Sequence, residues 1–402
     1  MPGFRALLAV VVLGLLAFEA GAQTPADEND PHPHHGEELL VLDPPADYLQ
    51  HLPDLGLEIL DVTDLPGIGS KLYHLRILDG AHPFEARDKH ETKFANVLVD
   101  AHHHFEHHKA KVDKGYTPRA ATNWQKAPSS CGKGLRIGIV DNMLDQKHPA
   151  FKGVKIKHRS FHLKGQKLAR TSHGTAVTSI IVGRGGWHGL LPGAEIVHAN
   201  VFHRGKKGKA VGSAKSIVRA IDWMIHQKVS VINFSIGGGK NKLVAKAIDH
   251  AAELGTIMVA SSGNRGPFSK KKSYPGAYKP VIAVTAVDRF ERSAKFATAL
   301  NYIDFAAPGV GIWTAVPGGG KAMSGTSFAA PVVTAYAAAA QKKSSASRQR
   351  MPYGTISANI RRTAASPAAT AIRAGGSCSC PRFANQSLSF MPSWLSSKPR
   401  PS

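Results

Sequence analysis

The 402-residue chain contains only three cysteines, Cys131, Cys378 and Cys380. Three cysteines cannot build a disulfide framework, so at most one bridge forms, and the sequence does not identify its partners. None of the three belongs to a nucleophile motif with histidine, and the Cys-Ser-Cys segment near the C-terminus lacks the second ligand pair of a zinc site. We therefore expect structural cysteines without thiol or zinc chemistry.

Acidic residues are also scarce, with 28 Asp and Glu against 51 Lys and Arg, which gives a formal charge of +23. None occurs from Phe305 to Ser402, so much of the basic excess lies in this C-terminal stretch. A strongly basic chain attracts phosphate surfaces. The sequence has no zinc-finger, RNP or basic-zipper pattern, however, so we expect no specific nucleic-acid partner. A basic envelope or nucleic-acid-binding protein is one alternative function.

Long hydrophobic runs are missing except near the N-terminus. Arg5 precedes an apolar run over residues 6–16, and small residues follow at Ala20-Gly21-Ala22. This is the pattern of a secretory signal peptide, which we assign to residues 1–22. The run is short for a bilayer span, and no later stretch approaches about 20 apolar residues, so we predict no transmembrane anchor. We expect an exported protein, periplasmic or extracellular.

Composition and periodicity divide the remaining chain into five parts. A Pro- and His-rich segment and a later polar segment are typical of linkers, and alternating apolar positions indicate a small α+β domain between them. The predicted parts are a linker at 23–38, an α+β domain at 39–108, a linker at 109–133, a main domain at 134–365 and a basic, disordered tail at 366–402.

Short apolar segments alternate with amphipathic ones in the main domain. Strand and helix in alternation, with nearly continuous apolar strands, predict an α/β fold: a three-layer parallel sheet with helices on both faces. Functional sites in such folds lie at the carboxyl ends of the strands. The predicted strands are 135–140, 154–161, 195–202, 230–235, 256–261 and 280–287, and the predicted helices are 213–227 and 240–253.

Three segments carry candidate catalytic groups. Asp141 ends the first predicted strand, His173 lies in Ser-His-Gly-Thr-Ala-Val, and Ser327 lies in Ser-Gly-Thr-Ser-Phe-Ala-Ala-Pro. Taken singly, each is weak evidence, because a carboxylate after a strand or a histidine at a helix start is common. In this order, they closely resemble the motifs of the subtilisin-like serine peptidases, family S8.

The resemblance implies the fold described above and a division of labour among the three residues. Asp141 orients His173, His173 accepts the proton of Ser327, and Ser327 attacks the scissile carbonyl. Asn264, in Ser-Ser-Gly-Asn-Arg-Gly, matches the residue that completes the oxyanion hole. Histidine as the base implies activity near neutral pH.

The same resemblance places a substrate pocket between two segments. The residues matched to its walls are Ser235, Ile236 and Gly237 on one side and Ser261, Ser262 and Gly263 on the other. Arg265 and three lysines at 270–272 follow, which suggests tolerance of acidic P1 residues and rejection of basic ones; solvated surface charges are the equal alternative. We expect no cofactor and assign no metal site, because the chain lacks the calcium-binding loop of many members between 183 and 192.

The small domain at 39–108 resembles the propeptides of this family, which inhibit their own enzyme until cleaved. Residues 97–105 would then be the strand that leads toward the active site. Histidines 102, 103, 104, 107 and 108 either bind a metal, release the propeptide on protonation, or form a solvated linker.

The match has departures, including Met143 where members usually have Gly, and it ends near Ala365. We predict a secreted serine endopeptidase that acts on polypeptides through an acyl-enzyme and is made as a self-processing zymogen. The alternative is a catalytically silent binding protein with the same fold.

Overall fold

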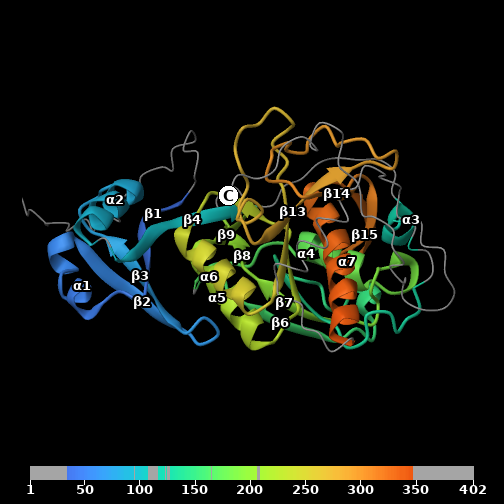
Figure 1. The fold of residues 1–402 in the computed structure, drawn as a ribbon, viewed down its shortest axis with the longest axis horizontal. Helices are drawn as coiled ribbons and strands as arrows, with labels where there is room; N and C mark the ends of the chain where they lie inside the picture. Colours follow the sequence, from blue (N-terminus) through green and yellow to red (C-terminus); the bar gives the residue numbers. More distant parts are fainter. Residues whose placement is uncertain are drawn as a thin grey trace, which may run out of the picture.

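The computed structural model describes residues 34–346 apart from 95, 107–115, 123, 125–126, 164 and 206–208. A small N-terminal domain lies beside a larger domain, and strand β4 (Leu98–Glu106) runs from the first onto the second (Figure 1). The predicted signal peptide, the basic tail, Cys378 and Cys380 lie outside the described residues.

A seven-stranded sheet forms the middle layer of the larger domain, in the order β14-β13-β12-β10-β5-β7-β6. All its neighbouring strands are parallel. Every residue of β12 and β13 is buried, as expected for a sheet covered on both faces. The strands are β5 (Arg136–Asp141), β6 (Ile156–Ser160), β7 (Glu195–Asn200), β10 (Val231–Phe234), β12 (Ile257–Ser261), β13 (Val281–Val287) and β14 (Phe305–Pro308).

Helices cover both faces of this sheet, which confirms the predicted three-layer α/β fold (Figure 1). Helices α4 (Ser172–Val182) and α7 (Thr326–Ala346) pack in one core, and α5 (Ala214–His226) and α6 (Lys242–Glu253) pack in the other. The side chains of Ser213 and Asn241 cap α5 and α6 by accepting backbone N–H bonds. The hairpin β15 (Ile312–Val316) and β16 (Gly319–Met323) precedes α7.

The N-terminal domain contributes four antiparallel strands to a second sheet. They are β1 (His34–Leu42), β2 (Leu57–Leu65), β3 (Ser70–Ile77) and β4, accompanied by α1 (Ala46–Gln50) and α2 (Pro83–Lys93). Leu39 and Val41 of β1 face the domain's own core, whereas Leu40 and Leu42 pack in the core that contains α5 and α6. The sheet is therefore buried on both faces, and apolar contacts hold the domain on its larger neighbour.

Strand β4 continues this sheet onto the larger domain. It pairs with β9 (Ala210–Ser213), which pairs with β8 (Phe202–Arg204), and its last residues pair with β11 (Gly237–Gly238). The strand matches the predicted segment 97–105 within one residue at each end, and residues of the larger domain supply its later hydrogen bonds.

Parts of both predicted linkers are structured, so those predictions were wrong there. Residues 34–38 belong to β1, because their backbone pairs with β3 and β4. In the second linker, Pro118–Thr122 forms α3, and Trp124 is 1% exposed with its ring 4.7 Å from that of Tyr336. Cys131 is buried and disulfide-bonded, as expected for a structural cysteine.

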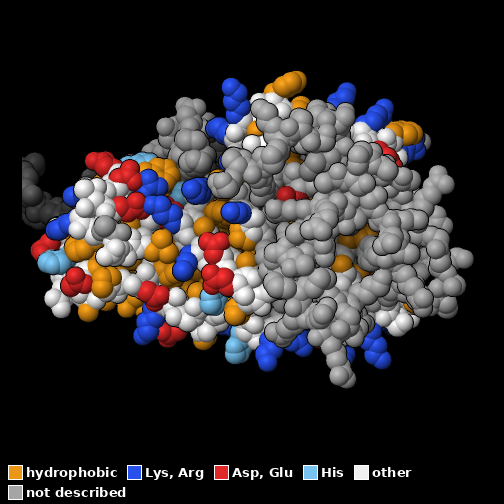
Figure 2. Space-filling model, in the orientation of Figure 1, with side chains coloured by type: hydrophobic (Ala, Val, Ile, Leu, Met, Phe, Trp, Pro, Cys, Tyr) orange, Lys and Arg blue, Asp and Glu red, His pale blue; other side chains and the backbone are white. Residues whose placement is uncertain are grey.

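Acidic and basic side chains are interspersed over the N-terminal domain, whereas Lys and Arg dominate the edges of the larger domain in the same view (Figure 2). Among the described residues, the search for a helix long and apolar enough to cross a membrane found none.

Candidate active site

Asp141 and His173 meet at the carboxyl end of the central sheet. Asp141 is the last residue of β5, and His173 is the second residue of α4. The Nδ1 atom of His173 lies 2.8 Å from Asp141 Oδ1 and 3.0 Å from Oδ2, and the two residues are 2% and 0% exposed. A buried carboxylate at this distance fixes the ring orientation and directs Nε2 away from itself.

Asn142 and Gly174 hold the strand end against the helix. The Gly174 backbone N–H donates to Asn142 Oδ1 at 2.6 Å, which satisfies one free donor at the start of α4. A Cβ atom on Gly174 would lie 2.5 Å from the Asn142 carbonyl oxygen, so only glycine allows this approach. Neither Asn142 nor Gly174 was among the predicted site residues. The only sequence signal for them is that each directly follows a predicted residue, Asp141 or His173.

Ser327 lies in the first turn of α7, and this turn packs against the same histidine through the residue that follows Ser327. The ring of the next residue, Phe328, is centred 5.3 Å from the His173 ring. The Ser327 hydroxyl donates to the Ser235 carbonyl at 3.1 Å, and the Ser235 hydroxyl donates to the Ser327 carbonyl at 2.7 Å. These two bonds attach the start of α7 to the end of β10.

Asn264 lies on the other side of the α7 N-terminus. Its Oδ1 accepts hydrogen bonds from the backbone N–H and the hydroxyl of Thr326, at 3.1 and 2.9 Å. Its Nδ2 is buried and has no hydrogen-bond partner among the described residues. Because Oδ1 is occupied by Thr326, the residue before Ser327, the Nδ2 group is the part of the amide that remains available as a donor.

The two predicted pocket walls are connected. The Ser261 hydroxyl donates to the Ile236 carbonyl at 3.2 Å, and Ser235, Ile236, Ser261 and Ser262 are all 0% exposed. The structure therefore brings both wall segments together beside Ser327.

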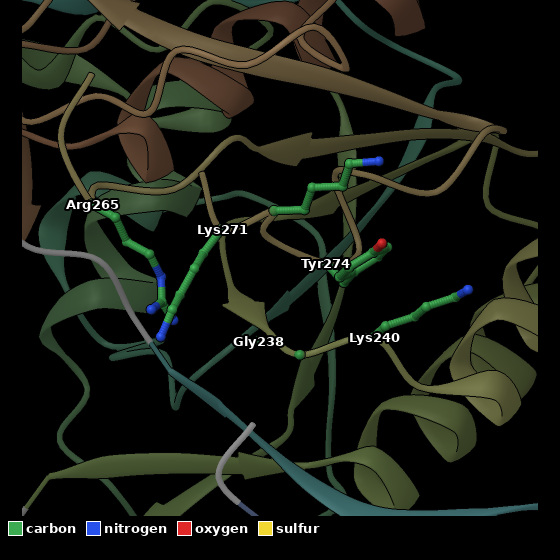
Figure 3. Close-up of a pocket in the computed structure, with 7 residues that line it drawn as sticks. Gly238, Lys240, Arg265, Lys271 and Tyr274 are labelled. Atoms are coloured by element: carbon green, nitrogen blue, oxygen red, sulfur yellow. The ribbon is translucent and has the colours of Figure 1, made fainter. Parts of the chain in front are cut away.

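A cavity of about 320 Å³ lies next to these walls. Figure 3 shows the side chains of Arg265 and Lys271 running alongside each other, with Tyr274 between Lys271 and Lys240. The described residues that line it are Gly238, Gly239, Lys240, Arg265, Lys271, Lys272 and Tyr274. None of these described residues is acidic and four are basic, so the cavity attracts anions.

The end of β4 lies on the wall segment that follows Ser235. Glu106 pairs with Gly237 and Phe105 pairs with Gly238 in antiparallel register. A Cβ atom on Gly238 would lie 2.7 Å from the His104 carbonyl oxygen, so glycine permits this close pairing. The strand therefore runs where an extended peptide would add to the sheet edge.

The β4 histidines are not a solvated linker, so that alternative was wrong for the described positions. His102 is 0% exposed and His103 is 2% exposed, because both lie in a strand between two domains. His107 and His108 lie outside the described residues.

The fold is that of a subtilisin-like serine peptidase, and the predicted residues Asp141, His173 and Ser327 lie at the carboxyl end of its sheet and at the start of two of its helices. The subtilase family model matches residues 132–380, so the chain belongs to the subtilase family.

Relatives and solved structures agree with this family. The major intracellular serine protease of Bacillus subtilis is 32% identical over 230 residues, 54% of this chain and 70% of that protein. Subtilisin E of B. subtilis is 30% identical over 217 residues, 52% of this chain and 55% of that protein. The crystal structure of fervidolysin from Fervidobacterium pennivorans, described as a keratinolytic enzyme related to subtilisin, has a TM-score of 0.68 at 22% identity. That fold match covers 85% of this chain and 58% of fervidolysin.

Proposed function

We propose that this subtilase hydrolyses peptide bonds within polypeptides through Asp141, His173 and Ser327. The observation that carries the proposal is the buried Asp141–His173 pair, held at 2.8 Å beside a serine at a helix N-terminus. The Ser327 hydroxyl turns from the Ser235 carbonyl toward His173 Nε2, gives up its proton and attacks the scissile carbonyl. The resulting oxyanion receives N–H bonds from Asn264 Nδ2 and the Ser327 backbone. His173 then protonates the leaving amine, and water hydrolyses the acyl-enzyme.

We further propose that the chain is an exported precursor whose N-terminal domain inhibits it. Export rests on the N-terminal sequence pattern, and inhibition rests on β4, which pairs with the edge that a substrate would use. Polar contacts support a specific docking. Asp100 Oδ2 accepts from the Lys242 backbone N–H at the start of α6 at 2.6 Å, and Asp222 Oδ1 accepts from the backbone of Ile68 at 3.0 Å.

The cationic cavity supports a preference for acidic side chains at P1. Arg265 and Lys271 both line it, and a substrate carboxylate there would form charge-assisted hydrogen bonds. Exchanging Arg265→Glu should lower kcat/KM for Glu-P1 peptides at least tenfold relative to Leu-P1 peptides. Arg292→Glu, which changes an exposed arginine paired with Asp288, is the matched control. If Arg265→Glu changes kcat/KM equally for the Glu-P1 and Leu-P1 peptides, these basic side chains are solvated surface charges that do not contact the P1 residue.

Intact mass and casein digestion at neutral pH test the main proposal. Wild type and the exposed-site control Ser293→Ala should both lose their N-terminal region and digest casein, whereas Ser327→Ala should do neither. If all three fold but remain full length and inactive, the chain is a catalytically silent binding protein.

A further inference from the structure

Histidines gather where the N-terminal domain meets the larger domain. His35 on β1 and His102 on β4 stack with ring centroids 4.4 Å apart, and His104 lies edge-on to His35 at 4.2 Å. His203 of β8, which belongs to the larger domain, lies 6.1 Å from His35. The catalytic proposal uses none of these four residues.

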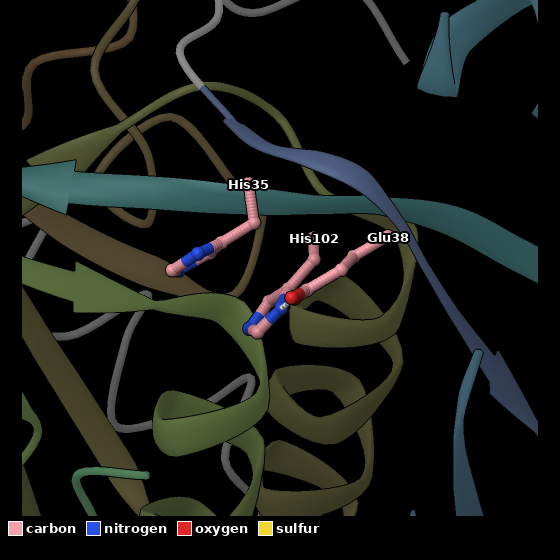
Figure 4. Close-up of side chains that lie close together, drawn as sticks. All are labelled: His35, Glu38 and His102. Atoms are coloured by element: carbon pink, nitrogen blue, oxygen red, sulfur yellow. Dashed lines mark hydrogen bonds and ion pairs between the residues drawn. The ribbon is translucent and has the colours of Figure 1, made fainter. Parts of the chain in front are cut away.

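A carboxylate joins this cluster. Glu38 Oε2 lies 2.7 Å from His102 Nδ1 and 2.8 Å from His74 Nε2. One ligand atom from each of His35, Glu38 and His102 can be chosen so that all three lie within 4.8 Å of one another. Figure 4 shows these three side chains projecting from β1 and β4 into one space, with Glu38 in contact with His102.

The imidazoles are incompletely satisfied. The Nε2 atoms of His35, His102 and His104 are buried without a hydrogen-bond partner in the described part of the chain. Buried polar atoms usually have a partner, so three such atoms in contacting rings require an explanation.

The side-chain chemistry of the cluster suits a cation. Three imidazole rings and one carboxylate meet in this cluster, and the Glu38 carboxylate contacts His102 directly. Neutral imidazole nitrogens and a carboxylate are the ligand forms that a transition metal requires.

We propose that His35, Glu38 and His102 bind a Zn²⁺ ion in the N-terminal domain, beside its contact with the larger domain, with His104 as the fourth ligand. Imidazole and carboxylate ligands suit zinc, whereas calcium prefers oxygen ligands alone. Ligand atoms around tetrahedral zinc lie about 3.3 Å apart, so side-chain shifts of about 1 Å would bring the ligand atoms of His35, Glu38 and His102 to this spacing.

Such an ion would join β1 to β4, two strands of the N-terminal domain, at the point where β4 begins to pair with β9 of the larger domain at His104. It would therefore hold β4 in the position from which it pairs with β9 and β11. The consequence for activation rests on the proposed function, but zinc binding itself does not.

Zinc titration of the full chain tests the site. Using Ser327→Ala as the background removes self-processing, and competition with a chromophoric chelator measures the affinity. We expect one Zn²⁺ per chain with Kd below about 1 μM. His35→Gln and Glu38→Gln should each weaken binding at least tenfold, whereas His250→Gln on α6 should leave it unchanged.

Two further measurements distinguish the loss of a ligand from the loss of the fold. Near-UV circular dichroism in EDTA should be the same for all variants, and the tetrahedral Co²⁺ absorption of the parent should be lost in His35→Gln and Glu38→Gln. If the folded parent binds no zinc at micromolar concentration, or if both variants bind it as tightly as the parent, the proposal is overturned. Neither outcome depends on whether the chain cleaves peptides.

Discussion

Acid should destabilise the larger domain through one buried histidine pair. His198 on β7 is 0% exposed, and its Nδ1 lies 3.1 Å from Nδ1 of His158 on the neighbouring edge strand β6. Burial, and then the proximity of His158, lowers the pKa of His198 to about 3. Burial also lowers the pKa of His158.

The sign follows from proton uptake. Histidine in the unfolded chain titrates near 6.5, so between about pH 6.5 and 3 the unfolded state binds a proton that the folded state excludes. Stability is therefore full above pH 6.5 and falls as the pH decreases. For His198 alone, the loss between pH 8 and pH 5 is about 2 kcal/mol.

Urea unfolding of Ser327→Ala at pH 8, 6 and 5 measures this loss without autolysis. Other buried histidines add to the total, so the informative quantity is the difference between the parent and His198→Gln. The variant should lose about 2 kcal/mol less than the parent between pH 8 and pH 5, whereas the exposed control His226→Gln should behave like the parent. Equal losses in the parent and His198→Gln would refute the reasoning.

Three other substitutions test the site and the domain contact. Asn142→Ala should lower the free energy of unfolding by about 1–3 kcal/mol, because it leaves the buried Gly174 N–H unpaired, and should reduce kcat more than it raises KM; chemical denaturation and peptide kinetics measure both. Gly238→Ala should displace β4, because the new Cβ would lie 2.7 Å from the His104 carbonyl oxygen; faster proteolysis of the N-terminal domain, with an unchanged rate for Gly186→Ala, whose new Cβ meets no atom within 4 Å, would support this. Asn264→Ala should lower kcat about 10²–10³-fold with little change in KM, a magnitude taken from subtilisin; an unchanged kcat would remove Asn264 from the oxyanion site.

Local patterns predicted the regular elements well. The predicted helix at 213–227 matches α5, and the predicted strand at 280–287 matches β13, each within one residue at its ends. Both are continuous segments whose amphipathic pattern or apolar run is visible over at least seven residues. The short strands β8, β9 and β11 were missed, because two to four residues carry no periodic signal and their pairing depends on β4.

The chemistry of the site was predicted from its motifs, but its supports were not. The order of Asp141, His173 and Ser327 identified the candidates. The bonds from Gly174 to Asn142 and from Thr326 to Asn264 join segments that are far apart in the sequence or lie on different elements, so no local pattern reveals them.

The sequence by itself determined the family, the layered α/β fold and the three candidate catalytic residues, because these depend on local patterns and motif order. Only the tertiary structure decided that β4 pairs with β11 and that His35, Glu38 and His102 come together. These contacts join residues from separate strands and domains. The energies of these contacts depend on burial and on the distances between residues that only the folded chain brings together.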